Sequence, residues 1–192
     1  MVNCVIQIAA SQIPDQVPCD LKVCRENMMQ KPNFYVFTGG SSSGKSSIID
    51  GLREAGHICV PEAGRIVVRE ENASGGCGQP WVNLDRFADL IFDKARTAFE
   101  EHQHIKEPVF FDRSFIEVLS CAKVLTRDIP QIHLDVARSH RFNPKVFVTP
   151  PWQEIFTNDA ERKTTFDAAV EDYEVNTATY RACGYDLIEV QA

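Results

Sequence analysis

A stretch of eight residues, GGSSSGKS at positions 39–46, constrains the fold of this chain more than any other part of its sequence. Its spacing is G-x-x-x-x-G-K-[ST], and it lies between a short apolar run, Phe34–Phe37, and a segment of helical periodicity, Ser46–Ala55. A strand before the glycines and a helix after them form the context in which this spacing makes a phosphate-binding loop. The alternative is a serine-rich turn before a helix, but chance rarely supplies both flanking elements.

The chemistry of this loop gives its positions distinct roles. Glycines let the backbone wrap around a phosphate without Cβ clashes, and the helix N-terminus supplies N–H groups and partial positive charge. Lys45 is expected to reach the β- and γ-phosphates of a nucleoside triphosphate, and the Ser46 hydroxyl is expected to bind Mg²⁺. The expected nucleotide-binding residues are those of the loop and the turn after it: Gly39, Gly40, Ser41, Ser42, Ser43, Gly44, Lys45, Ser46 and Ser47.

After residue 33, apolar runs of strand length alternate with helix-period segments, which is typical of an α/β protein with a parallel sheet. The expected strands are Phe34–Phe37, His57–Val60, Val109–Phe111, Lys145–Thr149 and Tyr185–Val190. The expected helices cover Ser46–Ala55, about Glu62–Glu71, a long segment behind an Asn83 cap, a segment after a Ser114/Glu117 capping-box spacing, Ile132–Arg141 and Phe166–Tyr180. Gly56 and Gly184 are expected to follow helix ends, and Ala73–Pro80 to be a mobile loop.

The chain of 192 residues is long enough for one domain with a sizeable core. Residues 33–192 are expected to form this domain. Residues 1–32 contain Pro14 and Pro18 and no long periodicity, so they are expected to be a poorly ordered N-terminal extension. A misassigned start codon is an alternative, because methionines stand at positions 28 and 29.

Composition excludes several classes of function. The chain has 20 basic and 27 acidic side chains, a net charge of −7, which argues against non-specific binding to nucleic acid. No apolar run approaches the length that spans a bilayer, so a cytoplasmic protein without a membrane partner is expected. The seven cysteines are scattered and form no CxxC pair, so we expect reduced thiols and no cysteine metal site.

Charged side chains follow two of the expected strands. Glu62 comes after the second strand, and Asp112 and Arg113 come at the end of the third. Parallel sheets bind ligands at the carboxyl ends of their strands, where a carboxylate can hold Mg²⁺ or take a proton from an acceptor hydroxyl. The alternatives are an acidic residue in the first turn of a helix for Glu62 and an ordinary loop residue for Asp112. Ser114 is expected to cap a helix rather than act as a nucleophile.

A polar segment, residues 158–163, lies between the fourth strand and the last helix and contains Arg162 and Lys163. A basic side chain here is expected to close over the transferring phosphate as part of a lid. The alternative is a solvated charged turn.

Five segments together suggest a family: FTGGSSSGKSS, VPEAGR, FFDRS, DAERKTTF and GYDLIEV, in this order along the chain. This series resembles the AAA-type P-loop domain of bacterial nicotinamide-riboside kinases and of predicted ATPases. The resemblance implies a five-stranded parallel sheet of order 2-3-1-4-5, with Asp112 beside the phosphate loop, Glu62 near the acceptor and Arg162 in a lid. It also implies ATP as the usual donor. The DRS segment is similar to that of deoxynucleoside and nucleotide kinases, in which Arg113 would orient the phosphoryl group.

The leading hypothesis is an ATP- and Mg²⁺-dependent kinase for a nucleoside, nucleotide or similar small hydroxyl acceptor. In this hypothesis Lys45, Arg113 and Arg162 stabilise the transferring charge, Ser46 and Asp112 organise Mg²⁺, and Glu62 is the base or an acceptor ligand. The alternatives are a nucleotide-binding regulatory switch and a plain ATPase. The sequence leaves open the acceptor, the choice between ATP and GTP, and the oligomeric state.

Overall fold

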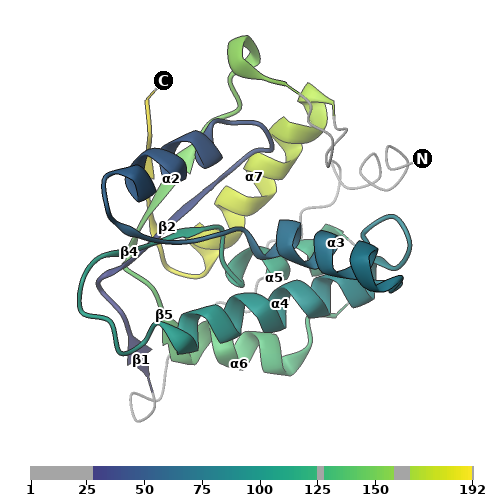
Figure 1. Cartoon of the computed structure of the whole chain (residues 1–192), viewed down its shortest axis with the longest axis horizontal. Helices are drawn as coiled ribbons and strands as arrows, with labels where there is room; N and C mark the ends of the chain where they lie inside the picture. Colours follow the sequence, from purple (N-terminus) through teal and green to yellow (C-terminus); the bar gives the residue numbers. More distant parts are fainter. Residues whose placement is uncertain (1–27, 125–127, 158–164, 192) are drawn as a thin grey trace.

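The computed structural model describes residues 28–124, 128–157 and 165–191 of the chain (Figure 1). Its main sheet contains β2 (Phe34–Gly39), β3 (Ile58–Val60), β4 (Val109–Asp112), β6 (Lys145–Thr149) and β7 (Asp186–Glu189). All neighbouring strands are parallel, and their order across the sheet is β3-β4-β2-β6-β7. Counted along the chain this order is 2-3-1-4-5, so the expected α/β class and strand order are confirmed.

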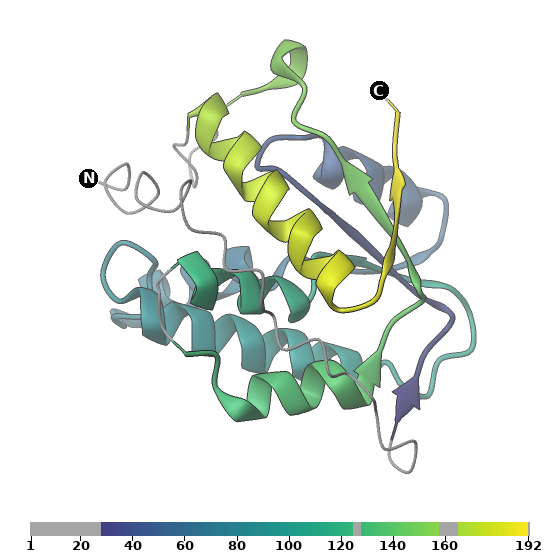
Figure 2. The same cartoon turned by 180° about the vertical axis from the view of Figure 1, so that it is seen from behind.

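Helices cover both faces of the sheet, which gives the domain three layers (Figures 1 and 2). Helix α2 (Lys45–Glu54) lies on one face and α7 (Phe166–Ala182) on the other. Helix α5 (Ile116–Val124) packs against α7, and α4 (Leu84–Glu101) and α6 (Gln131–Ser139) pack against α5. Helix α3 (Ala63–Ser74) packs against α4, and a 3-10 turn, η2, covers Gln153–Ile155. In the part of the chain that the structure describes, no helix has both the length and the apolarity to cross a bilayer.

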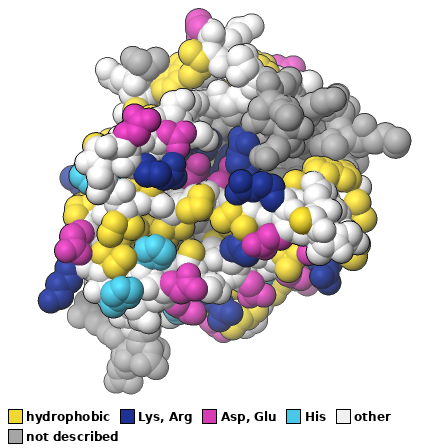
Figure 3. Space-filling view, in the orientation of Figure 1, with side chains coloured by type: hydrophobic (Ala, Val, Ile, Leu, Met, Phe, Trp, Pro, Cys, Tyr) yellow, Lys and Arg dark blue, Asp and Glu magenta, His cyan; other side chains and the backbone are white. Residues whose placement is uncertain are grey.

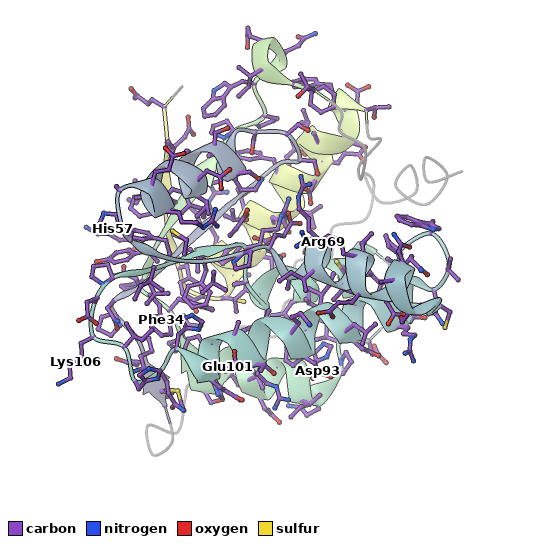
Figure 4. All side chains as sticks on the ribbon, in the orientation of Figure 1. Phe34, His57, Arg69, Asp93, Glu101 and Lys106 are labelled. Carbon is purple, nitrogen blue, oxygen red and sulfur yellow. The ribbon has the colours of Figure 1, made fainter. Side chains whose placement is uncertain are left out.

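Alternating residues of the central strand build a core on each face of the sheet. Phe34 is completely buried, and its ring lies 5.1 Å from those of Phe99 in α4 and Phe111 in β4 (Figure 4). On the opposite face, Phe37 stacks on Phe147 of β6 at 5.0 Å. The continuous apolar runs in the sequence are therefore strands that are covered on both sides.

The residues expected to mark the start or the end of a helix are found in those positions. The Asn83 side chain accepts a hydrogen bond of 3.0 Å from the backbone N–H of Arg86 and caps α4. Gly56 and Gly184 follow α2 and α7 with φ of 88° and 78°, the left-handed conformation that glycine adopts most readily.

The expected end of the sixth helix is wrong, because an unexpected pair of short strands begins where the helix stops. Met29–Gln30, expected in the extension, form strand β1, which pairs in parallel with β5, His140–Arg141. Helix α6 therefore ends at Ser139 instead of continuing through Arg141. Strands of two residues, such as β1 and β5, are too short to leave a periodic signal in a sequence. The rest of the expected extension, residues 1–27, lies outside the described part of the chain.

The segment expected as a loop from Ala73 to Pro80 is shorter and better anchored than its glycines suggest. Helix α3 continues through Ser74, and the backbone N–H of Gly78 donates a 2.6 Å hydrogen bond to the Glu71 carboxylate. The side chain of Gln79 is buried and donates to the side chain of Asn72 at 3.1 Å. This segment is therefore tied to the end of α3.

Candidate nucleotide and acceptor site

The loop between β2 and α2 has the backbone conformation that its sequence predicts. Gly39 has a φ of 136°, and a Cβ there would lie 2.2 Å from the backbone oxygen of Thr149 in the neighbouring strand. Gly44 is the N-cap of α2 in the left-handed conformation, with a φ of 80°. No side chain among the described residues caps α2, so its first N–H groups face the loop.

Lys45 lies inside this loop rather than in solvent. Its side chain is buried, and Nζ donates to the backbone oxygens of Gly40 at 2.5 Å and Gly39 at 3.2 Å and to Ser43 Oγ at 3.1 Å. Burial, followed by the positive charge of Arg113, lowers the pKa of Lys45 to about 8, against the opposing effect of nearby carboxylates. The ammonium group is thus held by oxygen atoms inside the loop.

The serines of the loop divide into two groups. Ser43, Ser42 and Ser41 bind other segments of the protein: Ser43 Oγ bonds Thr149 Oγ1 at 2.6 Å, Ser42 Oγ donates to the Thr157 backbone oxygen at 2.5 Å, and Ser41 Oγ donates to Asp172 Oδ2 at 3.5 Å. Ser46 and Ser47 lie exposed in the first turn of α2. The Ser46 hydroxyl is therefore accessible to a metal ion, as its expected role requires.

Glu62, Asp112 and Arg113 meet at the carboxyl edge of the sheet. Asp112 is the last residue of β4 and pairs in register with Phe37, two residues before the phosphate loop. Glu62 is at the N-cap position of α3, two residues after the end of β3, and its side chain is buried. Because β3 and β4 are neighbours, both carboxylates lie on the same side of the loop.

Arg113 is surrounded by three carboxylates, two of them buried. Its φ of 67° is unusual for a residue with a side chain, and its guanidinium is paired with Glu62 at 3.5 Å, Glu117 at 2.5 Å and Asp172 at 3.1 Å. Burial alone would lower the pKa of Arg113, but these three carboxylates raise it well above its usual value. The pKa of Glu117 is raised because burial outweighs the attraction of Arg113. Arg113 is therefore always charged and rigidly held.

The expected capping box is only half correct. Ser114 Oγ accepts a hydrogen bond from the N–H of Ile116 at 3.1 Å, so it caps the start of α5 as expected. The Glu117 carboxylate does not return to the backbone of Ser114 but binds Arg113 and accepts from the Tyr180 hydroxyl at 3.3 Å. Glu117, which the sequence marks as a capping residue, therefore holds Arg113 in the site.

A pocket of about 950 Å³ extends from the phosphate loop across this charged edge. Its polar end contains Ser41 of the loop with Glu62, Asp112, Arg113 and Asp172. Its apolar wall is formed by α4 and the segment before it, and the residues involved are Pro80, Trp81, Phe87, Leu90 and Ile91. The face shown in Figure 3 has hydrophobic side chains across its middle, with basic and acidic groups beside them.

Three further residues bear on the expected site: Arg162, Lys163 and Asp172. Arg162 and Lys163, the expected lid residues, lie outside the described residues. Asp172, in the middle of α7, was missed, because the sequence marks this segment only as a helix with an apolar stripe and gives no sign that its polar residues reach the site. Among the described residues, no group of three or more His, Cys, Asp or Glu could hold a metal. A Mg²⁺ at Ser46 and Asp112 would have phosphate oxygens and water as its other ligands.

The fold and this loop together define a P-loop nucleotide-binding domain. A family model described as an AAA domain matches residues 34–192, and the chain belongs to this family. Comparison with curated protein sequences gives no match. AAA-type P-loop domains generally bind ATP with Mg²⁺, whereas the finer resemblance to nicotinamide-riboside kinases stays a prediction.

Proposed function

We propose that the protein is a cytoplasmic, ATP- and Mg²⁺-dependent kinase that phosphorylates a hydroxyl group of a small molecule. The observation that supports this proposal most strongly is the pocket of about 950 Å³ that borders Ser41 of the phosphate loop. A nucleotide switch or a plain ATPase needs only a nucleotide and water, whereas this volume fits a second substrate of drug-like size. Two carboxylates, Glu62 and Asp112, line the pocket at the end nearest the loop.

The donor side of the site is formed by the phosphate loop. Its backbone and the α2 N-terminus suit the phosphates of ATP, and Lys45 carries the positive charge beside them. Ser46 and Asp112 would hold Mg²⁺, which neutralises charge on the phosphate oxygens when it is bound. Arg113 extends the positive charge toward the acceptor pocket.

Glu62 is the proposed base or acceptor ligand. Its carboxylate is buried at the polar end of the pocket, with Oε1 3.5 Å from Arg113 Nε and Oε2 3.4 Å from Arg65 Nε. These two contacts orient the carboxylate toward the pocket. An acceptor hydroxyl placed there would donate its proton to Glu62 while its oxygen attacks the γ-phosphate.

The charges of the pocket favour an acceptor without phosphate. The described cations that line it, Arg65, Lys94 and Arg113, all form ion pairs with protein carboxylates. Carboxylates outnumber cations in the lining, so an acceptor phosphate would meet net negative charge. A nucleoside-like or other uncharged hydroxyl compound is therefore a better fit than a nucleotide.

The experiment is to measure ADP formation from ATP and Mg²⁺ with a panel of nucleosides, their monophosphates and other hydroxyl compounds. We expect an unphosphorylated compound to stimulate ADP formation, and Lys45→Ala to abolish the stimulation. Matched pairs of nucleoside and monophosphate test the charge argument directly. ATP binding without stimulation by any compound would contradict the kinase proposal and favour the regulatory alternative.

A further inference from the structure

Asp172 connects the phosphate loop with the arginine of the acceptor pocket. Its Oδ2 accepts from Arg113 Nη2 at 3.1 Å and from Ser41 Oγ at 3.5 Å. The side chain is 36% exposed and lines the polar end of the pocket.

The orientation of Asp172 is fixed by hydrogen bonds to its second carboxylate oxygen. Its Oδ1 accepts from Asn176 Nδ2 at 2.8 Å, and Asn176 Oδ1 accepts from Ser120 Oγ at 2.8 Å. Ser120 also donates to the backbone oxygen of Glu117, the other strong anchor of Arg113. A chain of hydrogen bonds between α5 and α7 thus joins the Asp172 carboxylate to the backbone of Glu117, the residue whose carboxylate also binds Arg113.

The backbone of α7 also lies directly against the phosphate loop. A Cβ on Gly40 would be 2.6 Å from the backbone oxygen of Ala169, one turn before Asp172. The loop therefore has no room to move toward α7. Asp172 is on the same helix, is held by Asn176 and binds Arg113, so α7 sets the distance between the loop and Arg113.

We propose that Asp172 is a positioning residue that places the Arg113 guanidinium at the edge of the phosphate loop and, through its negative charge, weakens the binding of nucleotide there. The consequence for phosphoryl transfer rests on the proposed kinase function. The consequence for ATP affinity requires only that the loop binds nucleotide.

The proposal predicts that loss of the Asp172 charge lowers the rate of phosphoryl transfer but does not weaken ATP binding. This difference distinguishes a positioning residue from one that only stabilises the fold. Removing the charge leaves Arg113 with fewer anchors, so the rate of the chemical step falls. The same change removes a negative charge beside the loop, so ATP binds equally well or more tightly. A residue that only stabilised the fold would weaken binding and rate together.

The test compares Asp172→Asn with Glu174→Gln, which removes the same charge from an exposed position on the same helix. Titration with ATP and Mg²⁺ gives the affinity, and ADP formation with the acceptor panel gives the rate. In Asp172→Asn we expect the rate to fall about tenfold or more, with ATP affinity unchanged or up to about threefold tighter. Asp172→Glu should recover part of the rate, and Glu174→Gln should match the wild type in both.

Any weakening of ATP affinity beyond about twofold, or a rate within about twofold of the wild type, would overturn the proposal. If no compound stimulates the wild type, the kinase proposal fails, and the role of Asp172 is then decided without turnover. Hydrogen exchange at the Arg113 Nη2 hydrogens, which Asp172 accepts, followed by nuclear magnetic resonance, should be about tenfold faster in Asp172→Asn and unchanged in Glu174→Gln. Equal exchange in the wild type and both variants would overturn it.

Discussion

Glu62 Oε1 lies 3.5 Å from Arg113 Nε, although the two residues follow different strands and are 51 positions apart in the sequence. Val60 of β3 pairs in register with Phe111 of β4, and each charged residue comes two positions after its strand partner. The register of two buried strands therefore brings the proposed base and the pocket arginine together. This contact orients the carboxylate on which the proposed phosphoryl transfer depends.

Replacing Glu62 by Gln tests its role as the base. We expect acceptor-dependent ADP formation to fall at least about tenfold, because an amide cannot take the hydroxyl proton. Arg113 retains Glu117 and Asp172 as partners, so the variant should fold. The measurement is the initial rate at saturating ATP, with the exposed Glu54→Gln as the matched control. A loss smaller than this in Glu62→Gln would exclude Glu62 as the base.

The lowered pKa of Lys45 gives a prediction about pH. The free protein loses the Lys45 proton near pH 8 instead of at its ordinary pKa of 10.5, and bound phosphate should restore that proton. ATP affinity should therefore fall as the pH rises above about 8, and binding at a pH of about 9 should take up a proton. Calorimetry in two buffers of different ionisation enthalpy measures this uptake. It should be absent in Lys45→Arg, and its absence in the wild type would contradict the prediction.

The same pKa has the opposite consequence for stability. Because Lys45 holds its proton more weakly when folded than when unfolded, the unfolded chain binds more protons between about pH 8 and 10.5. The contribution of Lys45 to the free energy of unfolding should therefore rise across this range in the absence of nucleotide. Urea denaturation of the wild type and Lys45→Met at several pH values measures the difference. A wild-type contribution that falls with rising pH would refute the assignment.

Replacing glycine by alanine should have opposite effects on stability at positions 39 and 51. Gly39→Ala would place a Cβ 2.2 Å from the Thr149 oxygen at a φ of 136°, so we expect a loss of about 2–4 kcal/mol of stability and loss of ATP binding. Gly51 lies within α2 with no atom within 4 Å of an added Cβ. Gly51→Ala should therefore stabilise the protein by about 1 kcal/mol. Urea denaturation and ATP titration of both variants check the pair, and equal effects would be inconsistent with the loop geometry.

Trp81 is expected to bind the apolar part of the acceptor. It is 55% exposed at the rim of the pocket, where burial against a ligand would release apolar surface from water. Trp81→Ala should raise the KM for the acceptor about tenfold and leave ATP affinity unchanged. Val82→Ala is the matched control, since Val82 is 59% exposed but does not line the pocket. The same KM in both variants would place the acceptor elsewhere.

The parts of this structure that the sequence predicts are those in which local signals agree with packing. The phosphate loop, the five strands and the Asn83 cap depend on neighbours in sequence, and all are found. Each strand is apolar along its length because both of its faces are covered, so its pattern is easily identified.

The parts that the sequence does not predict depend on contacts between distant segments. The pairing of β1 with β5 joins residues about 110 positions apart through two residues each, too few for a pattern. Glu117 has the spacing of a helix cap, but a buried arginine competes for its carboxylate and is the stronger partner. Asp172 becomes part of the site only because α7 packs against the loop.

The most direct test of the central claim follows the γ-phosphate of labelled ATP. With the compound that best stimulates ADP formation, the proposed kinase predicts that the label appears on that compound in equal amount to the ADP formed. Lys45→Ala should give neither product. Release of the label as inorganic phosphate, with none on the acceptor, would show an ATPase and contradict the account.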